Sequence, residues 1–417
     1  MILARITLRS LLNRRLTVAL TILAIALSTA LFLGVEKVRT GARTSFANTI
    51  SGTDLIVGAR SGSVSLLLYS VFRIGNATNN ITWQSYQDIA RHPSVAWAVP
   101  ISLGDSHRGF RVLGTTPDYF EHYRYRGGRL LAFEQGAAFD DLFDTVVGAD
   151  VAATLGYRLD DPMVVAHGLA SFSKHDDKPF RVAGVLAKTG TPADRTVFVS
   201  LEGIEAIHID WKDGRRTSGR GLSADMVRKM ELTPKAVTAA LVGVTSKIKS
   251  FQLQRDINTY ETEPLLAILP GVALQELWEI VGVAESALIG VSVMVVITAL
   301  LGMTVMIFSS LNERRREMAI LRAVGARPVT VFGLLVTEAV FMTVAGVTIG
   351  VTVLYAGLLM ARPVVDAHFG LYLPIDMLNQ HEFALLGAVT AAGAFVSILP
   401  AFRAYRLSLA DGMAMQT

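Results

Sequence analysis

The histidines and carboxylates are the residues of this chain that could ligate a metal or transfer a proton. Eight histidines are scattered along the sequence, and two of them, His167 and His175, precede Asp176 and Asp177. Imidazole and carboxylate groups are ligands that zinc accepts. The spacing fits no standard zinc site, however, and residues 174–178 alternate in charge as a solvated turn does. We therefore expect a turn here and no metal.

The sequence lacks the motifs that carry catalysis in common enzyme classes. It has no phosphate-binding Gly-rich loop that ends in Lys-Ser or Lys-Thr, no His-Glu-x-x-His and no Ser-centred nucleophile elbow. It also has no cysteine, so thiolate chemistry is excluded. The formal net charge is +4, but much of the basic charge lies beside apolar runs, where it orients a membrane protein. We predict neither an enzyme nor a nucleic-acid-binding protein.

One short charged segment, residues 312–326, lies between two long apolar runs. Apolar residues, among them Met318 and Leu321, recur in it at helical spacing, while residues 314–316, all arginine, take the other face. Such a segment can lie on a membrane surface or dock against a partner protein. Alternatively, it is a loop whose arginines only fix the topology.

Four apolar runs are long enough to form the elements that flank this segment, in a chain that is 51% hydrophobic. They are Leu16–Val35, Ser286–Leu311, Ala339–Ala361 and Phe383–Leu399. About 20 apolar residues in a helix cross the hydrocarbon core of a bilayer. If all four runs cross, the basic clusters at 5–15, 314–327 and 403–406 fall on one side, which predicts that both termini are cytoplasmic.

The sequence predicts an α-helical membrane protein with four transmembrane helices and an α+β extracytoplasmic domain between helices one and two. The outer loop that we expect near its end contains Pro363, Pro374 and His368, which indicate turns rather than a site. The predicted order begins with a basic N-terminal segment (1–15), helix 1 (16–36), the outer domain (37–280) and helix 2 (284–311). It continues with a cytoplasmic segment (312–333), helix 3 (338–361), the outer loop (362–381), helix 4 (382–400) and a cytoplasmic tail (401–417).

Within the outer domain, alternation and capping signals predict individual elements. Residues 83–91 form a helix with Thr82 as N-cap, and 149–155 form another that Gly156 ends. Strands are predicted at 54–57, 93–100, 110–113, 144–147, 180–186 and 196–199. The apolar patch 65–72 is interpreted as a buried strand or helix, the alternative being a surface that contacts lipid or a partner. Residues 234–247 indicate a helical or mixed segment.

The polar residues of the predicted spans argue against an ion-coupled carrier. The acidic candidates Glu36, Glu285, Glu338 and Glu382 lie near the ends of the spans and not at the midplane. Gly346 and Gly350 have the small-xxx-small spacing that lets two helices approach closely. The sequence leaves open whether that approach occurs within the chain or across a dimer.

The charged segment also resembles a known family. The run Glu313, Arg314, Arg315, Arg316, Glu317, Met318, Ala319, Ile320, Leu321, Arg322, Ala323, Val324, Gly325, Ala326 is similar to the E-R-x-x-E-I-A-I-L-R-A-x-G-A signature of the permease subunits of MacB/FtsX-type ABC transporters. Weaker matches occur at 112–120, 127–129, 147–156 and 180–186. Residues 400–407 resemble the family's ending, although Leu409 stands where a proline is usual.

The resemblance implies a function and a set of partners. It implies a bacterial inner-membrane permease, a homodimer, with a periplasmic domain of porter and sabre parts. Residues 313–325 would form the coupling helix that docks on a separate ATPase, present in two copies, which would bind ATP and Mg. Motion would pass to the outer domain, where a substrate is exported or extracted, and a periplasmic or outer-membrane partner is an open option. The alternative is an FtsX-like regulator that switches a periplasmic hydrolase or signalling partner without transport.

Overall fold

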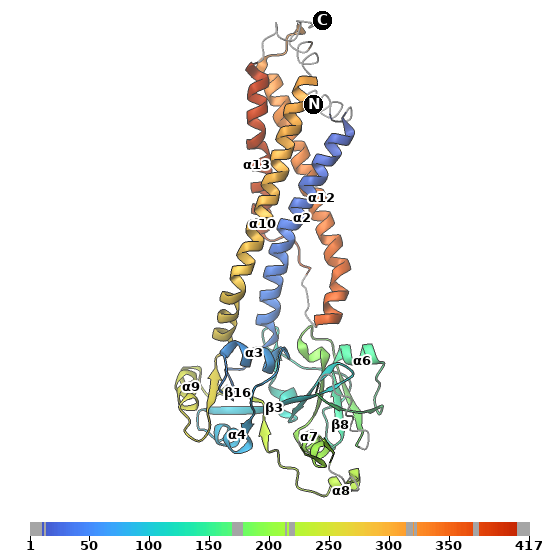
Figure 1. Ribbon diagram of the computed structural model, residues 1–417, viewed down its shortest axis with the longest axis vertical. Coiled ribbons are helices and arrows are strands. Elements are labelled where there is room, and N and C mark those ends of the chain that lie inside the picture. Colours follow the sequence, from blue (N-terminus) through green and yellow to red (C-terminus); the bar gives the residue numbers. More distant parts are fainter. Residues whose placement is uncertain are drawn as a thin grey trace. The chain divides into compact units, whose positions relative to one another are not determined.

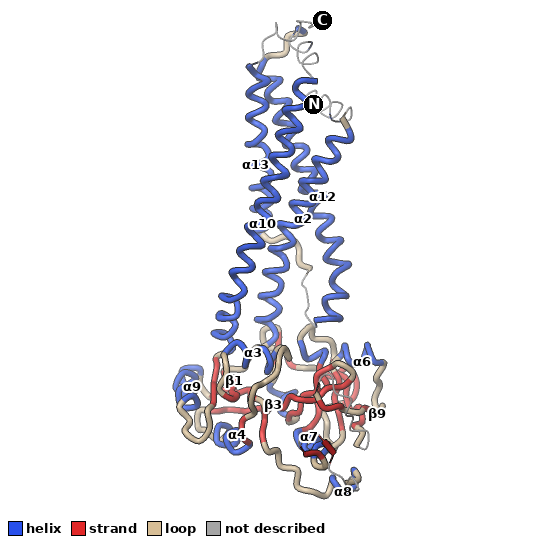
Figure 2. The backbone as a smooth tube through the Cα atoms, in the orientation of Figure 1, coloured by secondary structure: helices blue, strands red, loops and turns tan. Residues whose placement is uncertain are grey.

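The computed structural model describes residues 11, 14–168, 178–212, 215–216, 222–313, 320, 323–369 and 375–406. They form two compact units. The membrane unit comprises the described residues within 1–41, 282–363 and 374–417, and the outer unit those within 42–281 and 364–373. Figure 2 shows that the strands belong to the outer unit.

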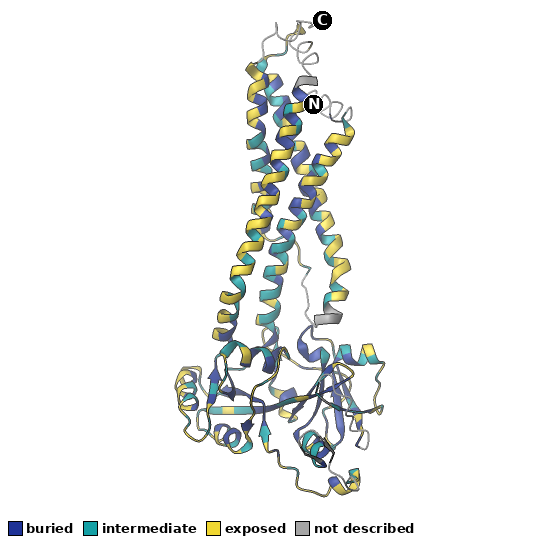
Figure 3. Ribbon diagram, in the orientation of Figure 1, coloured by how far each residue is buried: buried dark blue, intermediate teal, exposed yellow. Residues whose placement is uncertain are grey.

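Four helices of the described chain are long and apolar enough to cross a membrane. They are α2 (Arg15–Thr49), α10 (Pro270–Glu313), α12 (Pro328–Phe369) and α13 (Gln380–Arg406), as labelled in Figure 1. All four contribute to one apolar core, which contains Ile25, Met303, Met342 and Val389. Figure 3 shows that much of their remaining surface is exposed. It carries large apolar side chains such as Phe395, which a lipid environment accommodates without cost.

These helices extend beyond the charge-free runs from which the spans were predicted. α2 continues to Thr49, and α10 begins at Pro270 instead of 284. α12 runs to Phe369, so the expectation of a turn at Pro363 was wrong: this proline lies inside the helix. A helix does not have to end where the lipid ends, because its backbone hydrogen bonds are satisfied internally, and one proline removes only one of them.

The first lobe of the outer unit is built on an antiparallel arrangement of strands. Its strands and helices are β17 (Leu265–Ile268), β1 (Leu55–Ala59), β16 (Ala239–Val244), the first half of β3 (Val95–His107), α3 (Ser63–Val71), α4 (Trp83–Ala90) and α9 (Ser250–Asn258). Leu55, Val57, Val242 and Leu265 pack on one face with side chains of α4 and α9. Ile56 packs on the other face with Leu66 and Leu67 of α3.

The second lobe is mixed, because β4 pairs with β12 and β8 pairs with β11 in parallel. Its elements are the second half of β3, β4 (Phe110–Thr115), β12 (Thr196–Ser200), β8 (Asp144–Val147), β11 (Phe180–Leu186), β7 (Phe133–Gly136), β9 (Pro162–Met163), β10 (Ala166–His167), α5 (Asp118–His122), α6 (Ala149–Leu155) and α7 (Leu201–His208). Val112, Phe180 and Val197 are among the buried residues of its core.

Short elements complete the outer unit. They are the pairs β2 (Ile81–Thr82) with β15 (Ala236–Val237), β5 (Arg124–Tyr125) with β6 (Arg129–Leu130), and β13 (Trp211–Lys212) with β14 (Arg215–Arg216), together with α8 (Ala224–Val227) and 3-10 turns at Pro192–Arg195 and Lys247–Lys249.

The long strand β3 belongs to both lobes. Its first half pairs with β16 as far as Ile101, opposite Ala239. Its second half pairs with β4 from Ser102, opposite Gly114, and the register shifts between Leu103 and Ser106. Such a shift marks a bulge, where a strand bends and twists more strongly. β3 therefore runs through both lobes and bends between them.

Most predicted elements of the outer domain occur where the sequence placed them. The Thr82 side chain accepts a hydrogen bond from the Ser85 N–H at the start of α4, and Gly156 ends α6 with a φ of 73°. The patch 65–72 is a buried helix. The expectation for 234–247 was wrong, since β16 is a central strand that is buried on both faces, and such a short apolar run lacks the alternation that identifies a strand.

Candidate functional site

The charged segment is described only in part. α10 ends at Glu313, and the side chain of Glu313, residues 314–319 and Leu321 with Arg322 lie outside the described residues. Further along, the Val324 N–H donates to the Ile320 carbonyl at 3.0 Å, and Gly325 has a φ of 98°. A left-handed glycine directly after a helical turn is a common helix end. The predicted roles of Glu313 to Arg322 stay predictions.

The two glycines predicted to let helices approach lie against α2 of the same chain. A Cβ at Gly346 would lie 2.6 Å from Cγ2 of Ile25, and one at Gly350 would lie 2.6 Å from the backbone oxygen of Ala26. Gly393 of α13 similarly faces Thr343 of α12. The contact at Gly350 requires glycine, because a backbone atom cannot move aside as a flexible side chain can.

We expect Gly350→Leu to destabilise the membrane unit by about 1–3 kcal/mol, because the new side chain overlaps the backbone of α2. Gly357→Leu is the matched control on the same helix, since a Cβ there meets nothing within 4 Å. Thermal unfolding in detergent, followed by far-UV circular dichroism, measures both, because the four tryptophans of the sequence lie in the outer unit. Equal melting temperatures for the two variants would show that the α2–α12 contact does not restrict side-chain size.

A buried ion pair joins α2 to the start of α13. The Lys37 Nζ lies 3.1 Å from Oε2 of Glu382, and the two side chains are only 8% and 1% exposed. Lys37 also donates to the Asp376 carbonyl at 3.0 Å, and the Tyr355 hydroxyl of α12 donates to the same oxygen at 2.8 Å. Glu382 and Asn379 exchange backbone-to-side-chain hydrogen bonds of 2.9 and 2.8 Å, which is a capping box. We call these five residues the Lys37 cluster.

Other acidic residues that were predicted near the ends of the spans also have basic partners. Glu36 accepts from Arg39 at 2.8 Å and lies 3.9 Å from Nε2 of His381. Glu338 of α12 lies 3.7 Å from Arg14 and is 2% exposed. These pairs tie the helices of the bundle together, and none of them forms a chain of polar groups across it.

Inside the outer unit, the end of α2 packs against the beginning of α10. The rings of Phe46 and Trp278 meet edge to face at 5.5 Å, and the Arg43 guanidinium lies 5.4 Å from the Trp278 ring. Phe46 also contacts Phe72 at the end of α3, with ring centroids 4.3 Å apart. Phe46, with Ala273 and Leu274 of α10, belongs to the main core of the outer unit. Both helices are thus anchored in that core.

Two described histidines of the outer unit, His107 and His208, make structural contacts. Nδ1 of His107 lies 2.6 Å from the Val164 carbonyl oxygen and Nε2 lies 2.8 Å from the Tyr157 hydroxyl, and burial lowers the pKa of this ring. Burial also acts against the charge of His208, but the carboxylate of Asp105, 3.5 Å away, raises the pKa of His208 above its usual value. Because burial lowers its pKa, His107 is neutral at pH 7, and its two contacts link β3 to Tyr157 and Val164 of the second lobe.

No group of three or more metal-ligating side chains gathers anywhere in the described ranges. The candidate metal residues are not tested by this observation, since the side chain of His167 and all of His175, Asp176 and Asp177 lie outside those ranges. Sequence reasoning noted Glu382 but missed its partner Lys37. The spacing Asn379-x-x-Glu382 before an apolar run indicates a capping box and so the start of α13, but no local pattern points to Lys37.

Two parts of the chain match families of known proteins. Residues 18–259 match the MacB-like periplasmic core domain, and residues 289–409 match the FtsX-like permease C-terminal family. The first match covers α2 from residue 18 and nearly all of the outer unit before α10, and the second covers α10 from residue 289 together with α12 and α13.

Curated relatives and solved structures are similar to the chain at low identity. Two relatives, each named "Macrolide export ATP-binding/permease protein MacB", come from Shewanella sp. (strain ANA-3) and Shewanella oneidensis, with 25% and 24% identity. Both alignments cover 97% of this chain but only 59% of the relative. The periplasmic region of MacB from Actinobacillus actinomycetemcomitans covers 55% of this chain and 94% of its own, at 11% identity and a TM-score of 0.35. The extracellular domain of the noncanonic ABC-type transporter YknZ from Gram-positive bacteria covers 52% of this chain and 99% of its own, at 13% identity and a TM-score of 0.29.

Proposed function

This chain belongs to the MacB/FtsX-type family of ABC transporter permeases, and from that premise we propose that it couples ATP hydrolysis by a separate ATPase to the export or extraction of a substrate. The substrate is handled on the periplasmic side of the bacterial inner membrane, and both termini are cytoplasmic. ATP and Mg are bound by the ATPase and not by this chain.

The anchoring of α2 and α10 in the outer core is the observation that supports this proposal. At about 1.5 Å per residue, helices of 35 and 44 residues are about 50 and 65 Å long, well beyond the about 30 Å of the hydrocarbon core. The Phe46–Trp278 contact joins them within the outer unit. We therefore propose that a displacement of these helices is transmitted to the outer core.

We further propose that the charged segment is the input of this motion. Glu313, Arg314, Arg315, Arg316, Glu317, Met318, Leu321, Arg322 and Gly325 form the contact with the ATPase. Two permeases and two ATPases assemble, so that closure of the ATPase pair on ATP draws the cytoplasmic ends of the permeases together. A periplasmic or outer-membrane partner completes the path where the substrate requires one.

The absence of cysteine from the sequence makes a direct test possible. Ile248 is 89% exposed in the outer unit, so a spin label on Ile248→Cys is accessible and its two copies in a permease dimer report one distance. We expect ATP to change that distance by several ångströms in the complex with the ATPase, and Trp278→Ala to reduce the change. The control is the labelled permease without the ATPase, in which ATP should leave the distance unchanged. An unchanged distance on addition of ATP would rule out the proposed coupling.

Deletion of the gene separates transport from regulation. A compound or lipoprotein that accumulates on the wrong side of the membrane indicates transport. A periplasmic hydrolase that loses activity, with every tested solute correctly placed, indicates the FtsX-like regulator. We favour transport because the outer unit matches a MacB-like core and because the relatives named above are export proteins.

A further inference from the structure

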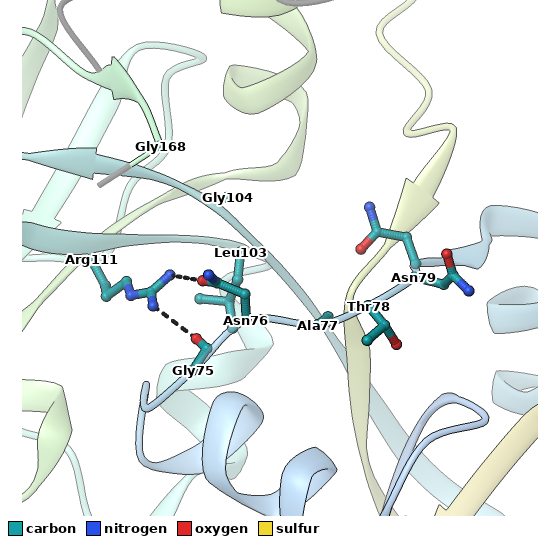
Figure 4. Close-up of a pocket in the computed structure, with 10 residues that line it drawn as sticks. Gly75, Asn76, Ala77, Thr78, Asn79, Leu103, Gly104, Arg111 and Gly168 are labelled. Atoms are coloured by element: carbon teal, nitrogen blue, oxygen red, sulfur yellow. Dashed lines mark hydrogen bonds between the residues drawn. The ribbon is translucent and has the colours of Figure 1, made fainter. Parts of the chain in front are cut away.

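A cavity of about 520 Å³ lies in the outer unit where the two lobes meet, as Figure 4 shows. The segment 75–80, which leads from α3 to β2, lines one side. Leu103 and Gly104 of β3, Arg111 of β4 and Gly168 line the other. A second cavity of about 500 Å³ adjoins it and shares Asn80, Leu103 and Gly104. Small-molecule sites have volumes of about 300–1,000 Å³ and commonly lie between domains.

The lining of the first cavity is polar, and Arg111 is the one charged side chain among its described residues. The guanidinium donates to Oδ1 of Asn76 at 2.7 Å and to the Gly75 carbonyl at 2.8 Å. Arginine has five N–H donors, so these two bonds leave capacity for an acceptor inside the cavity. Asn76, Thr78, Asn79 and Asn80 add amide and hydroxyl donors from the facing segment.

The electrostatic surroundings of Arg111 favour an anion. Burial lowers the pKa of Arg111, and the nearby cation Arg73 lowers it further. A bound anion would offset both effects. Arginine also presents its donors in a planar fork that matches a carboxylate or phosphate group.

We propose that this cavity binds a small solute through an oxyanion, a carboxylate or a phosphate group, which the Arg111 guanidinium and the side-chain amide of Asn76 hold. The rest of the solute extends past Gly104 toward the second cavity. Arg111 of β4 already bonds Gly75 and Asn76, and a bound oxyanion adds a further link between β4 and the segment 75–80. This inference does not depend on the ATPase.

The experiment uses the full chain in detergent and isothermal titration with two probes, succinate and inorganic phosphate, against sodium chloride of equal ionic strength. We expect at least one probe to bind, and Arg111→Gln to weaken it at least about tenfold. Arg108→Gln is the matched control, because Arg108 is an exposed residue in the turn of the same hairpin and does not line the cavity. The probe that binds identifies carboxylate or phosphate as the group recognised.

A second variant guards against a folding defect. Asn76→Asp places a carboxylate beside the Arg111 guanidinium and retains the hydrogen bond between the two side chains. The variant should therefore melt at no lower a temperature than the wild type but should no longer bind the probe. Failure of both probes to bind the wild type would overturn the proposal. Equal binding by wild type, Arg111→Gln and Asn76→Asp would overturn it as well.

Discussion

Replacing Leu321 by aspartate should weaken the assembly of this permease with its ATPase by about 30-fold. The residue lies on the apolar face predicted for the charged segment. A central apolar side chain at an interface contributes about 2 kcal/mol, which corresponds to that factor, and a buried carboxylate without a partner adds a desolvation penalty. Co-purification and the rate of ATP hydrolysis by the reconstituted complex measure the loss.

One further variant serves as the control for this prediction, and another tests the same segment a second time. Leu321→Met keeps the volume and the apolar character of the side chain, so it should assemble as the wild type does. Glu317→Arg reverses one charge in a segment that already contains three consecutive arginines, and we expect it to reduce assembly as well. Full assembly and coupled hydrolysis in both Leu321→Asp and Glu317→Arg would refute docking through this segment.

Glu382→Gln should lower the free energy of unfolding of the membrane unit by about 3–5 kcal/mol, because it leaves the Lys37 ammonium buried without its carboxylate. Glutamine keeps an oxygen that can accept from the Asn379 N–H, so the capping box is retained and the charge alone is lost. Denaturant or thermal unfolding in detergent gives the difference.

The double variant with Lys37→Met separates this pair from a general packing defect. Removing both charges should recover much of the stability that the single substitution removes, since the unpaired buried charge is then gone. If the double variant were less stable than the wild type by the sum of the two single effects, the two side chains would not be coupled in the folded protein.

Local signals account for the parts of this fold that could be predicted from the sequence. Thr82 and Gly156 mark helix ends through hydrogen bonding and backbone conformation, which depend only on neighbouring residues. The membrane helices follow in the same way from long charge-free runs. Their full lengths did not follow, because Glu276 and Glu279 of α10 lie outside the charge-free run although the helix includes them.

Long-range partners could not be predicted in this way. Lys37 and Glu382 are distant in the sequence, and only the packing of α2 beside α13 brings them together. The cavity beside Arg111 lies next to the bend of β3. No residue type within β3 predicts that bend. The charged segment presents the opposite case, because its pattern is distinctive in the sequence while most of its residues lie outside the described structure.

The path of β3 through both lobes restricts how the outer unit can deform. Hydrogen bonds hold its first half to β16 and its second half to β4, so neither half can leave its lobe without breaking a ladder. Side chains from both lobes, such as Ile56 and Phe198, also share one core. We therefore expect the lobes to shift relative to each other only by small rotations about the bulge between Leu103 and Ser106.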